Sequence, residues 1–151
     1  MRTRNPIAAL TLAALATAVT PAVAQVGSGL ADVNQIPEAE VAKLPHVTPA
    51  VAKQILERRP LASVTDLHAL LTGAGLGAAQ AAEVYGRAFV HVDLNTGTRQ
   101  ELLLIPGVGA RMAHELEEYR PWKSRQQFEK EIGKYVDARE VARLWRFVII
   151  P

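Results

Sequence analysis

The sequence predicts an all-helical protein made of two tandem copies of one unit, which follow a cleaved signal peptide. Three observations carry this prediction: an N-terminal segment that is first basic and then apolar, a self-similarity between the two halves of the remaining chain, and helical signals inside each copy. The chain has 151 residues and no cysteine, which excludes a disulfide framework, a zinc ribbon and a thiol nucleophile.

The segment 1–24 has the pattern of a secretory signal peptide. Arg2 and Arg4 precede an uncharged and mostly apolar run at 7–20, which is shorter than the roughly 20 residues that span a membrane. The tripeptide Ala-Val-Ala, which ends at Ala24, provides small residues where a signal peptidase cleaves. We therefore expect cleavage after Ala24, a flexible N-terminus at 25–31, and a periplasmic or secreted protein without a membrane span.

The remaining chain is a repeat. When the sequence is laid over itself so that Asp32 falls on Asp93, 32–71 aligns with 93–132, and ten of the forty positions are identical. The identical residues of the first copy are Asp32, Asn34, Glu40, Pro45, Val47, Ala52, Glu57, Arg59, Pro60 and Ser63. Self-similarity at a fixed spacing indicates one structural unit that is used twice. We assign copy one to 32–92 and copy two to 93–151.

The local signals in both copies are helical. Thr98 and Glu101 have the spacing of a capping box, in which two side chains bond to the first turn of a helix. Ser63 and Ser124 stand at matching positions, each shortly after a proline, where the next helix should begin. No stretch alternates long enough to predict a strand of ordinary length. Two short segments look extended, at 89–94 and 147–150.

One turn between predicted helices has the features of an anion site. Gly107 and Gly109 flank a valine, and glycine adopts backbone angles that a tight turn needs. The next helix begins with amides that have no partner in its own first turn, so it favours an anion such as phosphate. This segment resembles the helix-hairpin-helix motif, whose amides hold the DNA backbone without reading bases. The candidate DNA-binding residues are Gly107, Val108, Gly109, Ala110 and Arg111, with Gly75, Leu76 and Gly77 as a second contact.

The repeat as a whole is similar to the ComEA family, the extracytoplasmic DNA receptors of bacterial competence. The similarity covers 32–150. It implies two hairpins in each copy and a weak, sequence-independent contact with duplex DNA, as in DNA uptake. The residues that carry it are Asn95-Thr96, Glu101-Leu102, Pro106-Gly107-Val108-Gly109, Tyr119-Arg120 and Pro121-Trp122-Lys123-Ser124.

Two of the four expected hairpins depart from the motif. The first reads His46-Val47-Thr48 and the last reads Tyr135-Val136-Asp137, so both lack the two glycines, and the aspartate would repel phosphate. The hairpin at Gly107 has a cation close in sequence, Arg111, and we expect Lys123 and Arg125 to extend its charge.

The charge of the chain does not indicate a dedicated duplex-binding protein, which usually has a strongly basic face. Without Arg2 and Arg4 the 17 basic residues become 15, equal to the 15 acidic residues, so the exported chain has no net charge. From 25 to 92 there are five basic and six acidic residues, and from 93 to 151 there are ten and nine. Copy two is therefore only slightly more basic than copy one.

Two functions remain open on the sequence alone. The motif and the export signal favour a non-catalytic protein that binds DNA. The neutral charge and the two altered hairpins favour a protein–protein adaptor or structural subunit that uses the same fold without DNA. We recognise no combination of side chains that predicts an enzyme, and we expect no cofactor and no metal. His114 and Glu118 have the spacing of a surface pair on one helix, and the aromatic residues after 84 have positions typical of a core.

Overall fold

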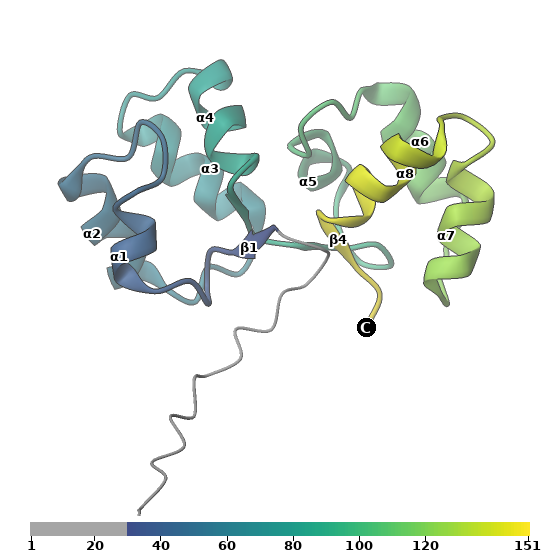
Figure 1. The fold of residues 1–151 in the computed structure, drawn as a ribbon, viewed down its shortest axis with the longest axis horizontal. Helices are drawn as coiled ribbons and strands as arrows, with labels where there is room; N and C mark the ends of the chain where they lie inside the picture. The colour runs from purple at the N-terminus through teal and green to yellow at the C-terminus, as the bar shows by residue number, and fades with distance from the viewer. Residues whose placement is uncertain (1–29) are drawn as a thin grey trace, which may run out of the picture.

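The structure, a computed structural model, describes residues 30–151, and the predicted signal peptide lies outside this part. Each copy is mainly helical and has the same order of elements: a strand, four helices and a strand (Figure 1). Copy one contains β1 (Ala31–Asp32), α1 (Glu38–Val41), α2 (Pro49–Arg58), α3 (Val64–Gly73), α4 (Ala78–Tyr85) and β2 (Ala88–Phe89). Copy two contains β3 (Val92–Asp93), α5 (Arg99–Leu103), α6 (Ala110–Glu118), α7 (Arg125–Ile132), α8 (Ala138–Trp145) and β4 (Val148–Ile149). Each copy begins one residue earlier than the sequence predicted, because Ala31, expected in the flexible N-terminus, and Val92 belong to the first strands.

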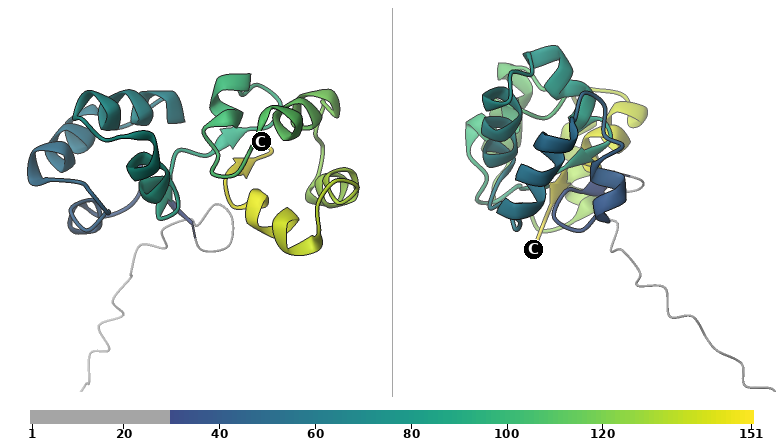
Figure 2. Two further views of the ribbon diagram at one scale, coloured as in Figure 1. Left: turned by 90° about the horizontal axis from the view of Figure 1, so that it is seen from above. Right: turned by 90° about the vertical axis from the view of Figure 1, so that its left-hand side faces the viewer.

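The helices of each copy form a lobe of their own. Figure 1 shows α1 to α4 in blue and teal on one side and α5 to α8 in green and yellow on the other, and Figure 2 shows the same division from above. The short strands lie where the two lobes meet. There Phe89 of β2 and Phe147, which precedes β4, form an edge-to-face ring contact with 5.1 Å between centroids. This contact joins the apolar interiors of the two copies.

The helices begin where the sequence places capping residues. Thr98 and Glu101 form a full capping box at α5, in which each side chain accepts the main-chain N–H of the other residue. Ser63 forms the same box with Asp66 at α3, and the Ser124 side chain caps α7. The observed first residues of α3, α5 and α7 confirm the helix starts that the sequence predicted.

Parallel pairs of two-residue strands close each copy, so the described part is mainly but not purely helical. In copy one β1 pairs with β2, with Ala31 opposite Ala88. In copy two β3 pairs with β4, with Val92 opposite Val148. The sequence indicated extended backbone near β2, β3 and β4 but gave no sign of β1, because two residues are too few to show alternation. Each pair ties the first element of a copy to its last.

One asparagine in each copy bridges the chain over the same distance. In copy two the Asn95 side chain donates to the carbonyl oxygen of Trp122 at 2.9 Å and accepts from the N–H of Trp122 at 2.6 Å. In copy one Asn34 forms the same two bonds with Leu61, at 3.0 and 2.8 Å. Both bridges span 27 residues. They therefore fix the start of each copy against the segment that leads into its third helix.

The two copies pack side chains of different size at matching core positions. Trp122 and Phe128 of copy two are 2% and 0% exposed, and Leu61 and Leu67 occupy the matching buried places in copy one. Trp122 also donates its indole N–H to the carbonyl oxygen of Leu116 at 2.8 Å. Because aromatic side chains bury more apolar surface than leucine, the core of copy two excludes more of it from water.

We expect copy one to open more readily than copy two, because it has leucines where copy two has Trp122 and Phe128. Native-state hydrogen exchange should therefore be faster for the amides of 41–71 than for those of 102–132. The variant Phe128→Leu gives copy two the residue that copy one has at the matching position, Leu67. It should reduce the difference in exchange rate between the two copies. Slower exchange in copy one, or equal protection in both copies, would contradict the expectation.

Candidate nucleic-acid interface

Four turns connect the helices in pairs, two in each copy. The first turn (45–48) joins α1 to α2, and the second (74–77) joins α3 to α4. The third turn (106–109) joins α5 to α6, and the fourth (134–137) joins α7 to α8. Each turn ends at the residue directly before a helix, so it decides which group meets the unpaired amides at the start of that helix.

The third turn leaves main-chain amides without partners. Gly107 has a φ of 82°, a conformation that favours glycine, and the side chain of Val108 is buried beneath the turn. Gly109 precedes α6 and has no side chain that could cap it. Within the described residues the N–H groups of Gly109, Ala110 and Arg111 therefore have no acceptor. They stand at the positive end of a nine-residue helix, which favours a bound anion.

The second turn has a similar backbone but fewer free amides. Gly75 has a φ of 91°, and the N–H of the half-buried Leu76 donates to the carbonyl oxygen of Leu71 at 3.0 Å. The N–H of Gly77 donates to the side-chain oxygen of Gln80 at 3.0 Å. The amides of 78 and 79 remain for an external acceptor. No cation occurs among residues 74–85 to strengthen such a contact.

The first turn keeps its shape although it has lost both glycines. His46 takes the left-handed conformation, with a φ of 60°, at the position that Gly107 occupies in the third turn. The sequence led us to expect a degraded turn, and the backbone corrects that expectation. The chemistry has nevertheless changed, because the Thr48 hydroxyl accepts the N–H of Val51 at 3.3 Å and Pro49 has no N–H. Two of the first three helix positions therefore cannot donate to an anion.

The fourth turn differs most from the third. None of the residues 134–137 has a positive φ. The Asp137 carboxylate accepts the N–H of Glu140 at 2.9 Å, so it occupies an amide and adds a negative charge. The Tyr135 hydroxyl lies 2.9 Å from the Tyr119 hydroxyl, and this hydrogen bond raises the pKa of Tyr135 above its ordinary value. The fourth turn therefore leaves the N–H groups of 137–139 without an acceptor in the described part, as the third turn does for 109–111, but it adds a carboxylate beside them.

Arg111 is the cation that the sequence placed beside the third turn. It is exposed in the first turn of α6, and its guanidinium lies 5.9 Å from the centre of the Tyr135 ring. It forms no ion pair with any residue of the described part. Lys123 and Arg125 follow α6 at its other end, and Arg125 is paired with Glu129 at 2.7 Å. The structure therefore does not bring these two residues to the third turn.

Helix α8 supplies a second cation to the third turn, which the sequence reasoning missed. A Cβ atom added to Gly107 would lie 2.9 Å from Nη2 of Arg143, so this guanidinium packs directly on the glycine. Arg143 also donates to both carboxylate oxygens of Glu140 at 2.7 Å, and these bonds lower the pKa of Glu140. When the start of α8 is aligned with the start of α4, Arg143 falls on Glu83, which contacts His46 of the first turn at 2.8 Å. The first turn thus has an acid beside it, and the third turn has an arginine that is paired with Glu140.

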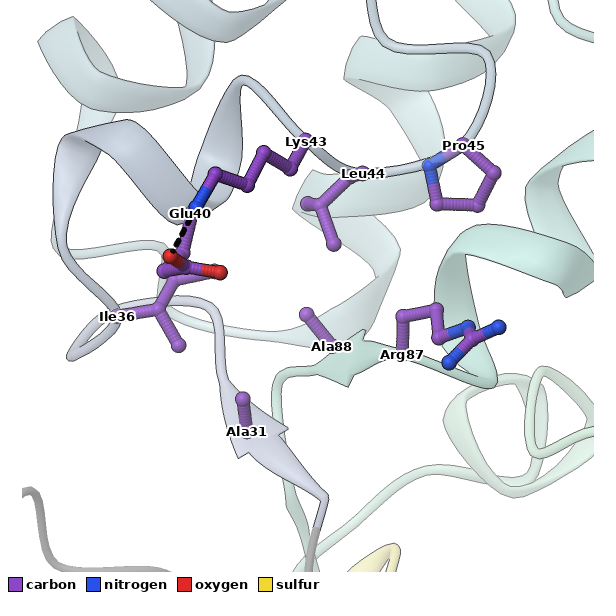
Figure 3. Close-up of a pocket in the computed structure, with 8 residues that line it drawn as sticks. All are labelled: Ala31, Ile36, Glu40, Lys43, Leu44, Pro45, Arg87 and Ala88. Carbon is purple, nitrogen blue, oxygen red and sulfur yellow. Dashed lines mark hydrogen bonds and ion pairs between the residues drawn. The ribbon is translucent and has the colours of Figure 1, made fainter.

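A groove of about 430 Å³ borders the first turn in copy one (Figure 3). Lys43 at its edge is paired with Glu40 at 2.7 Å, and Arg87 forms no ion pair within the described part. No histidine, serine, threonine or tyrosine lines this groove, so its walls provide no hydroxyl nucleophile and no histidine base. Its lining residues are Ala31, Ile36, Glu40, Lys43, Leu44, Pro45, Arg87 and Ala88.

Comparison with known proteins gives no match: the chain matches no family model, no curated protein and no solved structure. Over residues 30–151, no helix has the length and apolar character needed to cross a membrane. In the same range, no three or more His, Cys, Asp or Glu side chains are grouped to hold a metal ion. His114 and Glu118 form the surface pair that their spacing predicted, with 3.2 Å between Nε2 and Oε2.

The conformation of His46 makes a testable prediction about the first turn. A β-branched residue is strained at a φ of 60°, whereas glycine adopts this conformation freely. We expect His46→Val to lower the free energy of unfolding by about 1–2 kcal/mol more than His46→Gly does. Both variants lose the contact with Glu83, so the comparison isolates the contribution of the backbone conformation at position 46 to the free energy of unfolding. Urea denaturation measures the difference, and equal stability of the two variants would show that the turn is not left-handed.

Proposed function

We propose that this protein is an exported, non-catalytic helix-hairpin-helix protein that binds duplex DNA weakly and without sequence preference. One observation carries the proposal: at the third turn, unpartnered amides, Arg111 and Arg143 meet at the start of one helix. Amides and guanidinium groups are the donors that proteins commonly use for phosphate.

In this proposal one phosphate of the DNA backbone accepts hydrogen bonds from the N–H groups of Gly109 and Ala110. Gly107 allows the tight turn and Val108 fixes it to the core, so both act by positioning those donors. Arg111 and Arg143 add positive charge on either side. Contacts with phosphate position a protein on DNA but carry no sequence information, and this accounts for the lack of preference.

The second turn offers a weaker contact of the same kind. Gly75, Leu76 and Gly77 shape it, and the amides of 78 and 79 would face the phosphate. The charged side chain that residues 74–85 contain is an acid, Glu83, which opposes binding there. Copy two would therefore provide most of the affinity for DNA, and copy one would provide a weaker second contact.

The architecture supports a likeness to the ComEA family as part of the same proposal. Four helix–turn–helix pairs, two in each copy, agree in number and order with the hairpins that the sequence resemblance implies. Export rests on the pattern of residues 1–24, which lie outside the described residues. A periplasmic or secreted location would expose the third turn to external DNA.

The second candidate function is an extracytoplasmic adaptor or structural subunit that uses the fold without DNA. A specific observation favours it: the first and fourth turns have side-chain caps on their amides, and the exported chain has 15 basic and 15 acidic residues. In that case the third turn would only connect helices. The two functions differ in whether the free amides of α6 meet phosphate.

Titration with duplex DNA at several salt concentrations tests the lead proposal. If about 2–4 phosphates are contacted, the slope of log K against log salt should be about −2 to −4, with a dissociation constant in the non-specific range of about 10⁻⁴–10⁻⁶ M. Arg111→Ala should make the slope shallower by about 0.9 and lower the affinity for unrelated DNA sequences equally. The control Arg58→Ala removes an exposed arginine of copy one and should change neither quantity. If the protein binds no duplex DNA at low salt, the adaptor function becomes the better interpretation.

Gly109→Asp gives a sharper test, because it copies into the third turn the capping residue of the fourth. The backbone at Gly109 is extended, and an added Cβ would meet no atom within 4 Å, so the fold should accept aspartate. We expect stability to be equal or higher, since aspartate is a good N-cap for the N–H of residue 112. DNA binding should be lost, because the carboxylate places a negative charge beside the free amides of 109 and 110 and repels phosphate. Gly109→Thr, which copies the first turn, should bind with intermediate affinity. Unchanged DNA binding by a folded Gly109→Asp protein would refute the role of these amides.

A further inference from the structure

Helix α8 and the C-cap residue that follows it present three arginines on one face. Arg139, Arg143 and Arg146 follow one another at intervals of four and three residues, which places them along one side of a helix. They line a groove of about 650 Å³ together with Asp137, Glu140 and Ala142. We call Arg139, Arg143 and Arg146 the α8 arginine face. Figure 1 shows α8 in yellow.

These arginines are not a feature that the two copies share, because the matching helix of copy one has none of them. Helices α4 and α8 both have eight residues, so they align from end to end. Their buried positions correspond, with Ala81 and Val84 of α4 at the places of Val141 and Leu144. At the places of Arg139, Arg143 and Arg146, copy one has Ala79, Glu83 and Gly86. The same helix is thus built with one acid and no cation on this face.

The position of Arg139 also gives it no structural advantage. It is the second residue of α8, near the positive end of the helix, where a cation is electrostatically unfavourable. It is exposed and forms no ion pair within the described part. The next arginine, Arg143, packs on Gly107, so the face is continuous with the third turn. The surface therefore combines excess positive charge with a site that already favours phosphate.

We propose that the α8 arginine face binds the phosphodiester backbone of DNA beyond the phosphate held at the third turn. The inference rests on the proposed function and adds Arg139 and Arg146 to the residues that the proposed function already includes. From Arg139 to Arg146 the helix rises about 10 Å, which is close to the rise of three base pairs of duplex DNA. A duplex seated on the third turn could therefore place further phosphates along this face.

The test is the salt dependence of binding to a short duplex of arbitrary sequence, measured by fluorescence anisotropy. Arg139→Ala, which copies α4, should make the slope of log K against log salt shallower by about 0.9, and Arg139→Lys should restore it because the charge returns. Arg58→Ala removes the same charge from copy one and serves as the control. Circular dichroism checks that each variant keeps its helices.

The outcomes separate this inference from the function on which it rests. An unchanged slope in Arg139→Ala, together with a shallower slope in Arg111→Ala, would overturn the α8 arginine face and leave the third turn as the binding site. An equal loss in Arg58→Ala and Arg139→Ala would also overturn it, because net charge alone would then account for the effect. If the parent protein binds no duplex at low salt, both the proposed function and this inference fail.

Discussion

The amides at the start of a helix need an acceptor, and the four turns of this protein differ in whether they provide one. In the first and fourth turns a side chain of the turn itself, from Thr48 or Asp137, accepts the N–H three residues later. In the second turn Gln80 reaches back to the main chain. In the described part, the third turn offers no internal acceptor to the N–H groups of Gly109, Ala110 and Arg111 and no side chain that caps α6, so an external anion is their remaining partner besides water. The proposed contact with DNA depends on this difference, since the surrounding unit is built alike in both copies.

The two copies share the bonds that build the unit and differ in the charges around it. Asn34 and Asn95 bridge the chain over equal distances, and the arginines at 59 and 120 both donate to main-chain carbonyl groups near the start of their copies. By contrast, Glu83 stands beside the first turn and Arg143 beside the third. Bonds within the unit maintain the fold, whereas exposed charge can change without cost to the core. The two copies therefore share one architecture and differ in the charged side chains beside their turns.

Sequence reasoning could predict the features that depend on short or regular spacing. The capping box of Thr98 and Glu101 is local and the alignment of 32–71 with 93–132 is periodic, so both appear in the sequence directly. The left-handed conformation of His46 could not be predicted, because tertiary packing around the buried Val47 overrides the preference of the residue. Arg143 was missed for a similar reason: only the folded copy brings it against Gly107. The charge difference between Glu83 and Arg143 is visible in the sequence. Only the contacts with His46 and Gly107 show that these two residues lie beside the first and third turns.

The most direct measurement is a residue-resolved NMR titration of residues 25–151, the chain that the predicted cleavage would leave, with a short DNA duplex. The account predicts that the amide signals of Gly109, Ala110 and Arg111 shift most, because these N–H groups would meet phosphate. The amides of 78 and 79 should shift less, and those of the capped first turn should stay in place. Largest shifts in copy one, or no shift at DNA concentrations above about 10⁻⁴ M, the weak end of non-specific binding, would contradict the account.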